Sequence, residues 1–267
     1  MRSGTVRSRT VGGNAPAAVL WAELTKVRTL RSTAAALVLS LLVSVGIAVV
    51  DGLSVRHAID AGSDQVRPDF DPVNAGFVGV QFAQLGVLAF GVLLISGEYG
   101  SGMIRASLAA VPRRGLFYGG KIGAAVTVVL PLAVVMAFAG FLTSQGALGP
   151  YGVSLTEGAA LRAVMGACLY LTLMCLLAVG TATMLRGTAL SLGVLFSLVF
   201  VLSPVANAVP GLREVARYLP DHAGSQVMTV GSQADPVLGP WTGLLVLVCW
   251  TAAALTGGHL LLRRRDA

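Results

Sequence analysis

The segment from Glu98 to Lys121 carries the residues of this chain that are best suited to contact a partner protein. Its sequence, EYGSGMIRASLAAVPRRGLFYGGK, opens with an acid, continues through two glycines and an apolar stripe, and ends in a basic cluster. A carboxylate suits the exposed N–H groups and the positive dipole at the start of a helix, so we expect Glu98 to cap the helix that follows. Gly100 and Gly102 permit a sharp turn before that helix.

The apolar stripe of this segment can fill a groove on a partner. It consists of Met103, Ile104, Leu108 and Val111. We expect Pro112 to end the helix, and we expect Arg113 and Arg114 to bind acidic groups or lipid phosphates. A helix that only lies on a bilayer needs the same features, so both interpretations stay open.

Groups for bond-breaking chemistry are missing from the sequence. The run Gly119-Gly120-Lys121-Ile122 lacks the spacing and the hydroxyl of a GxxxxGK[ST] phosphate loop. The sequence has neither a Ser-His-Asp or Cys-His arrangement nor a zinc-binding spacing such as HExxH. We therefore expect that the chain is not an enzyme and that it holds no metal or cofactor of its own.

The composition indicates a membrane protein. Of the 267 residues, 55% are hydrophobic and 12% are charged, and soluble domains carry about twice that charged fraction. The apolar residues form runs of roughly 18 or more, which must be helical because lipid offers no partners for backbone groups. We predict an all-α polytopic fold in a single domain, 14–267, after a disordered basic tail, 1–13. The six predicted spans are 33–50, 77–96, 122–143, 163–185, 188–206 and 240–262.

The charges predict the orientation of these spans. Of the 19 lysines and arginines, all but Arg56, Arg67, Arg162, Arg213 and Arg217 lie on the side of the termini, whereas the acids on that side are Glu23, Glu98 and Asp266. Because basic residues concentrate in cytoplasmic loops, both termini are expected in the cytoplasm, with the chain in the plasma membrane. The net charge of +7 is then mainly a topology signal, joined by expected contacts with anionic membrane lipid, and we expect no nucleic-acid partner.

Residues 15–31 form a second segment that could contact a partner or the membrane surface. An apolar helical face is formed by Leu20, Leu24 and Val27, with Trp21 at its edge. The charged residues of the segment are Glu23, Lys26, Arg28 and Arg31. This pattern favours a helix that lies in the cytoplasmic interface over a continuation of the first span.

Polar residues within the spans could line a substrate path. The candidates are Gln81 and Gln84 in the second span and Ser191 and Ser197 in the fifth. We favour interhelical hydrogen bonds and close packing as their explanation, as for Ser40, Ser44 and Ala48 at four-residue spacing in the first span. The span cores carry no ionisable residue, which disfavours proton-coupled transport. Outside the spans, the stretch between Pro210 and Pro220 predicts one amphipathic helix that packs its leucines and valine against the outer span ends.

Three stretches resemble the permease subunits of ABC-2-type exporters, especially actinobacterial ones. They are WAELTKVRTLRST (21–33), SGEYGSGMIRASLAAVPRRGLFYGGK (96–121) and RYLPDHAGS (217–225), in the expected order among six spans. The resemblance implies a homodimer or heterodimer of permeases with separate ATPase subunits, which would hold ATP and magnesium. It also implies that the N-terminal helix and the loop between spans two and three form the coupling surface. By resemblance this loop includes Glu98, Tyr99, Gly100, Arg105, Pro112, Arg113 and Arg114.

The resulting expectation is a permease subunit that exports an amphipathic or lipid-like small molecule with the help of a separate ATPase. The alternative is a membrane partner, such as a sensor or resistance component, that recruits an ATPase without moving cargo.

The charge distribution makes a direct prediction about labelling. Cysteines introduced as Gly62→Cys and Ser232→Cys should react with an impermeant thiol reagent in intact cells, whereas Ser107→Cys should react only after lysis. Labelling of Ser107→Cys from outside the cell would overturn the predicted orientation.

Overall fold

The computed structural model describes residues 15–29, 31–62, 70–100, 102–111, 113–209, 211–231, 234–235 and 237–264. Within these ranges the regular structure is entirely helical. Six of the helical segments are long and apolar enough to cross a membrane. The predicted all-α polytopic fold is therefore confirmed, and the predicted tail, 1–13, lies outside the described residues.

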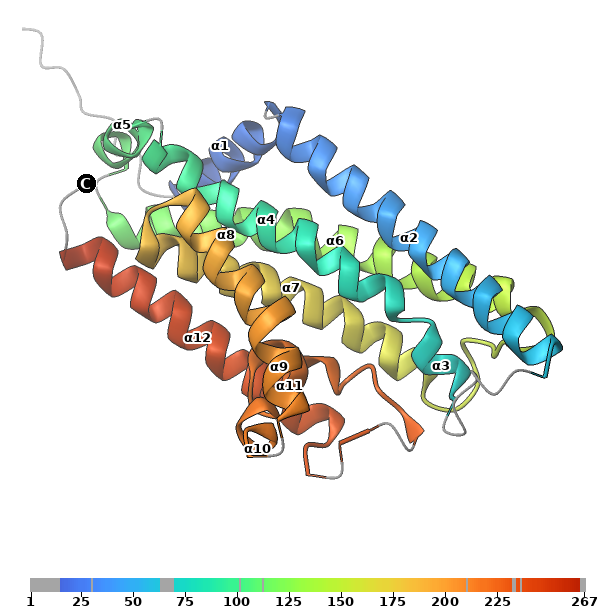
Figure 1. Cartoon of the computed structure of the whole chain (residues 1–267). Coiled ribbons are helices and arrows are strands. Elements are labelled where there is room, and N and C mark those ends of the chain that lie inside the picture. The colour runs from blue at the N-terminus through green and yellow to red at the C-terminus, as the bar shows by residue number, and fades with distance from the viewer. Residues whose placement is uncertain are drawn as a thin grey trace, which may run out of the picture.

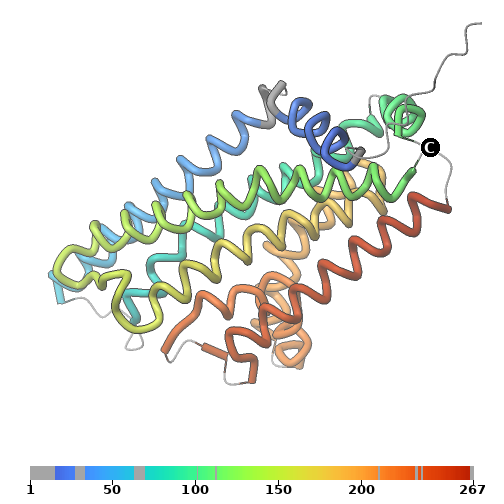
Figure 2. Tube along the Cα trace, turned by 180° about the vertical axis from the view of Figure 1, so that it is seen from behind, coloured from blue at the N-terminus to red at the C-terminus, as the bar shows by residue number. Residues whose placement is uncertain are grey.

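The helices in chain order are α1 (Ala15–Thr29), α2 (Arg31–Asp60), α3 (Pro72–Ala75), α4 (Val78–Gly100), α5 (Met103–Ala110), α6 (Arg114–Leu148), α7 (Ala160–Leu185), α8 (Thr188–Ser197), α9 (Ser203–Ala208), α10 (Arg213–Ala216), α11 (Pro220–Ser225) and α12 (Pro240–Arg264). The long helices α2, α4, α6, α7 and α12 run along one bundle, as Figures 1 and 2 show. Helices α1 and α5 lie at one end, which we call the α5 end (Figure 1). The opposite end, which carries α3, α10 and α11, is the α3 end (Figure 1).

Two of the spanning helices extend further than predicted. Helix α2 continues past residue 50 to Asp60, so Asp51 lies on a helix and not in the expected outer loop. At Gly52 the missing side chain lets α2 approach the backbone of α6, where a Cβ would lie 2.8 Å from the carbonyl oxygen of Ser144. Helix α6 begins at Arg114, well before the predicted start at 122. The predicted spans were shorter because charged residues near the ends of both helices resemble loop sequence.

Small residues bring α2 and α4 together. Ser44 Oγ donates a hydrogen bond to the carbonyl oxygen of Gly79 at 2.9 Å, and Ser40 Oγ donates to that of Ala83 at 3.0 Å. Ser40, Ser44 and Ala48 are all buried. The four-residue spacing of small residues therefore serves close helix packing, one of the two explanations that the sequence left open.

The fifth span is joined to α7 by a tight hairpin. Arg186 has a φ of +58°, a left-handed conformation that ends α7, and α8 begins two residues later. Further along, Leu198–Leu202 form a π-helical turn in which the N–H of Ser203 donates to the carbonyl oxygen of Leu198. Pro204 follows at once, and the wider turn makes room for its ring within the span.

The predicted short helix at the α3 end is present, but its apolar residues do not pack as expected. Helix α10 spans four residues, Arg213–Ala216, and the side chains of Leu212 and Val215 are 48% and 66% exposed. Pro220 begins the next helix, α11, because its fixed φ suits a first helical turn, which follows an extended Leu219. Pro210 lies outside the described residues.

The contact between α2 and α4 predicts a position where a single methyl group destabilises the bundle. In Gly79→Ala the new Cβ would clash with the backbone carbonyl oxygen of Ser44, which cannot move like a side-chain tip. We expect a loss of about 1–3 kcal/mol in the free energy of unfolding, typical of overpacked cores.

The matched control is Gly46→Ala, where a Cβ meets no atom within 4 Å. This variant should be neutral or slightly stabilising, because alanine favours a helix over glycine. Thermal unfolding of both variants in one detergent measures the difference, and equal stability would contradict the packing argument.

Candidate functional site

A cluster of four charged side chains lies inside the α5 end of the bundle. Lys121, in the second turn of α6, is only 1% exposed. Its Nζ lies 2.7 Å from Glu98 Oε1 on α4 and 2.5 Å from Glu23 Oε2 on α1. It also donates a hydrogen bond to the carbonyl oxygen of Leu94 at 3.2 Å. One buried ammonium therefore joins three helices that are far apart in the sequence.

Lys26 on α1 completes this group, which we call the ion cluster: Glu23, Lys26, Glu98 and Lys121. Lys26 Nζ lies 2.8 Å from Glu23 Oε1 and 2.8 Å from Glu98 Oε1. Two carboxylates thus face two ammonium groups, and the formal charges cancel. Neutrality is required here because isolated ions are very costly to remove from water.

Lys26 keeps its charge over the physiological pH range. Partial burial by itself lowers the pKa of Lys26, but hydrogen bonds and charge attraction from Glu23 and Glu98 outweigh burial and raise it above the ordinary value of 10.5. A lysine whose pKa is raised on folding stabilises the folded chain fully at any pH below its ordinary pKa. This stabilisation is lost only when the pH rises through the raised pKa of the folded state. The contribution of Lys26 is therefore constant near neutral pH.

The ion cluster fixes positions more than it adds stability. Taking ions out of water costs several kcal/mol for each ion, which their attraction only repays when geometry and hydrogen bonding are good. Among the described residues, Glu98 Oε2 is buried without a hydrogen-bond partner. Removing one member of such a group costs about 3–5 kcal/mol, because its partners stay buried and unpaired. The cluster thus penalises other arrangements of these helices.

Glycine makes room for the contact between α1 and α6. A Cβ on Gly120 would lie 2.5 Å from Val19 Cγ1, so a larger residue here would displace the Val19 side chain from the contact between α1 and α6. The next residue, Lys121, then meets Glu23, and its Nζ lies 5.6 Å from the centre of the Phe117 ring in a cation–π contact. The Gly-Gly-Lys run is therefore a helix-packing element.

Helix α1 is separate from the first span, in agreement with the prediction, but its orientation differs from the expected one. It ends at Thr29, and α2 leaves at an angle from Arg31 onward (Figures 1 and 2). Glu23 is 3% exposed and faces the bundle, whereas Trp21 is 62% exposed. The attraction of Glu23 for Lys121 thus determines which side of α1 turns inward. The side chain of Arg28 lies outside the described residues.

The prediction that Glu98 caps the following helix is wrong. Glu98 belongs to the last turn of α4, and its carboxylate binds the two lysines of the ion cluster. Helix α5 begins after Gly102, which has a φ of +70° and makes no side-chain cap. Only glycine adopts that conformation without strain, so the turn expected at the glycines is present at Gly102.

The apolar stripe of α5 faces its own chain. Ile104 is 4% exposed, and Leu108 and Val111 are half-buried against the core. The expectation that the whole stripe fills a groove on a partner is therefore not met in this arrangement, because three of its four residues already pack inside. The remaining member, Met103, is 50% exposed.

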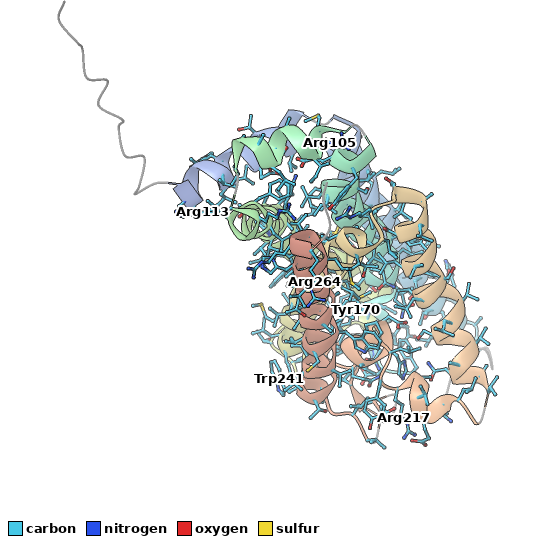
Figure 3. All side chains as sticks on the ribbon, turned by 90° about the vertical axis from the view of Figure 1, so that its left-hand side faces the viewer. Arg105, Arg113, Tyr170, Arg217, Trp241 and Arg264 are labelled. Carbon is cyan, nitrogen blue, oxygen red and sulfur yellow. The ribbon has the colours of Figure 1, made fainter. Side chains whose placement is uncertain are left out.

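The outer face of α5 leads directly to the ion cluster. Met103 and Arg105 are exposed on this helix, and Figure 3, which looks at the α5 end, shows Arg105 on its outer side. On the inner side, Ser107 Oγ accepts a hydrogen bond from Lys26 at 3.4 Å. A group that pushes on α5 would thus press on a residue bound to the ion cluster.

The other predicted coupling residues make separate contacts. The guanidinium of Arg186 lies over the ring of Tyr99 at 5.4 Å and links the end of α4 to the α7–α8 hairpin. Gly100 and Arg113 are exposed, and Arg114 Nη1 donates to the carbonyl oxygens of Leu262 and Arg263 at 2.7 and 3.0 Å. Pro112 lies outside the described residues.

The four predicted path residues are not brought together. Gln84 is buried and accepts a hydrogen bond from the hydroxyl of Tyr170, while Ser191 donates to the carbonyl oxygen of Gly187 in its own helix. Ser197 is exposed. Gln81 lines a cavity of about 540 Å³ at the α3 end, together with Asp51 and other residues of α2, α3 and α4 and residues near α11.

Sequence reasoning missed Lys121 and the pairing role of Glu23. The charge distribution contained a usable signal. Glu23 and Glu98 are acids on the side of the chain where basic residues predominate, and the orientation of the spans does not explain them. An acid in that position indicates a nearby cation. Which cation it binds depends on how α1 and α4 meet α6, and one sequence does not reveal that.

Comparison with known proteins identifies no relative, so a function must be argued from the geometry of the site. No protein-family model matches the chain, and no curated protein sequence matches it significantly.

The ion cluster predicts a large and reversible effect of one substitution. Lys121→Met leaves two buried carboxylates facing one ammonium, at a cost of about 3–5 kcal/mol, and we expect α1 to detach from α6. Amide hydrogen exchange in α1, measured by mass spectrometry on the purified chain, should therefore become faster. Adding Glu23→Gln should restore neutrality and most of the protection.

The matched control is Arg56→Met. Arg56 pairs with Asp60 at 3.7 Å, but their side chains are 44% and 50% exposed, and such pairs contribute only about 0–1 kcal/mol. If Lys121→Met left α1 as protected as Arg56→Met does, the cluster would not hold α1 in place.

Proposed function

We propose that this chain is the transmembrane permease subunit of an ATP-driven exporter, with the α5 end in the cytoplasm and hydrolysis carried out by a separate ATPase. The observation that supports this most is the ion cluster. It connects α1 and α5, which are suited to receive a partner, to α4 and α6, which are suited to cross the membrane.

A link of this kind is what conversion of partner motion into helix motion requires. Conformational change passes through packed elements that have discrete arrangements, and a hydrogen-bonded ion group can exchange partners where a close-packed apolar contact cannot. Lys26 contacts groups on α1, α4 and α5 at 2.8, 2.8 and 3.4 Å. A shift of α5 therefore changes the contacts of α4 and, through Glu98, those of α6.

The partner surface in this proposal is the exposed face of α5 together with the exposed side of α1. Met103 and Trp21 are 50% and 62% exposed, and Arg105 is exposed beside Met103. Apolar anchors next to an arginine are typical of the energetically important centres of protein interfaces. In this proposal two permease copies act together, each with its own such surface.

The cavity at the α3 end is the proposed exit site for cargo. Its volume of about 540 Å³ falls in the range of small-molecule pockets, roughly 300–1,000 Å³. Apolar side chains such as Phe77 and Met228 line it beside Asp51 and Gln81. This mixture suits an amphipathic molecule.

The proposal predicts that one exposed arginine controls ATPase binding. Arg105→Glu reverses a charge on an exposed residue of α5, so the protein should insert normally but lose the ATPase during affinity purification. Replacing a partner-contacting charge typically costs about 2–5 kcal/mol when the contact is buried. The readouts are ATP hydrolysis by the purified complex and ATP-dependent uptake of cargo into inverted vesicles, whose cytoplasmic face points outward.

Arg213→Glu is the control, because Arg213 is exposed on α10 at the opposite end of the bundle. It should keep the ATPase. If Arg105→Glu retained full hydrolysis, α5 would be a surface anchor only. If the complex hydrolysed ATP but moved no cargo, the chain would instead be a non-transporting partner of the ATPase.

A further inference from the structure

Two adjoining hollows lie between α6 and α12 at the α5 end, away from the ion cluster. The first, about 430 Å³, is lined by Tyr118 and Ile122 of α6 and by Leu255, Thr256, His259 and Leu260 of α12. The second, about 360 Å³, is lined by Arg114 and Gly115 of α6 and by His259 and Arg263 of α12. His259 belongs to both, so an apolar groove continues into a basic hollow.

The basic hollow is held together by contacts between the two helices. Arg114 Nη1 donates to the carbonyl oxygens of Leu262 and Arg263 at the end of α12, which fixes the guanidinium at the wall of the hollow. The His259 ring stacks on the Tyr118 ring with centroids 5.9 Å apart. The wall is thus built from residues whose positions are set by partners on the other helix.

The charges of the basic hollow favour an anion. Arg114 and Arg263 both line it, and no acidic side chain is among its described lining residues. Helix α6 also begins at Arg114, so its first turn brings the positive end of a 35-residue helix to the same place. Two guanidinium groups and a helix start make a place for a phosphate.

The apolar groove favours a hydrocarbon chain beside that phosphate. Leu260 is 51% exposed and Thr256 is exposed, so the groove opens on the outer side of the bundle, where lipid lies. Leu255 and Ile122 are half-buried and form its floor. A free phosphate ion would leave this groove unused.

We propose that the hollows between α6 and α12 bind an anionic phospholipid of the leaflet around the α5 end. The phosphate occupies the basic hollow between Arg114 and Arg263, and an acyl chain lies in the groove below His259. Basic pockets between transmembrane helices at the cytoplasmic side are suited to anionic headgroups. The site does not depend on the exporter proposal. It does rely on the orientation that the charges predict, because the cytoplasmic leaflet is the one that is rich in anionic lipid.

The test uses the full-length chain purified in a mild detergent and titrated with phosphatidylglycerol or phosphatidylcholine. Native mass spectrometry counts the bound lipid. The unmodified chain should prefer phosphatidylglycerol, and Arg263→Gln should weaken that binding about fivefold, the effect expected for one basic residue near an anionic lipid. Arg263 is exposed, so its replacement should not disturb folding.

Two further variants separate this site from general attraction. Arg113→Gln removes an exposed arginine at the same end that does not line the hollow, and it should bind phosphatidylglycerol like the unmodified chain. Gly115→Leu keeps every charge but fills the hollow, because a Cβ there already lies 3.5 Å from His259 Cε1. It should remove the preference for phosphatidylglycerol.

Three results would overturn the proposal. Equal loss in Arg263→Gln and Arg113→Gln would show general charge attraction. Full binding in a correctly folded Gly115→Leu, judged by size-exclusion chromatography, would place the lipid elsewhere. Equal affinity of the unmodified chain for inorganic phosphate and for phosphatidylglycerol would show that the hollow takes a free anion and that the groove plays no part.

Discussion

An ammonium group buried between helices must be neutralised within hydrogen-bond reach, and this constraint determines the α5 end of the bundle. Lys121 meets it with a carboxylate from α1 and another from α4, at 2.5 and 2.7 Å. A rotation of α1 by one residue would turn Glu23 by about 100° around the helix axis, away from its partner. The rotation and register of three helices therefore depend on one side chain, and α5 follows because it is tied to Lys26.

The middle of the bundle is held by a different kind of contact. Ser44 and Gly79 place the backbones of α2 and α4 so close that a methyl group does not fit. Such contacts resist small displacements because interiors pack as densely as crystals. The α5 end depends instead on the directional contacts of the ion cluster, which penalise other arrangements of its helices. The middle of the bundle is thus set by shape and the α5 end by charge pairing.

The spanning helices could be predicted from the sequence because lipid leaves few alternatives. Residues 163–185 and 240–262 correspond to α7 (Ala160–Leu185) and α12 (Pro240–Arg264). The errors lie where helices leave the apolar region, as at Asp60 and Arg114, because charged helix turns resemble loops in composition. The packing predicted for the short helix at the α3 end was also wrong, since Leu212 and Val215 have helical spacing but no surface of the described chain to pack against.

The candidate site was predictable in its location but not in its chemistry. Glu98 stands before glycines and a new helix, so its neighbours in the sequence suggest a cap, whereas its partner is 23 residues away on α6. Local pattern cannot rank the two, because a buried ammonium attracts a carboxylate more strongly than a helix start does. The same competition explains α5. Once Ile104 and Leu108 pack inward, the face that α5 leaves exposed is partly polar and carries Met103 and Arg105.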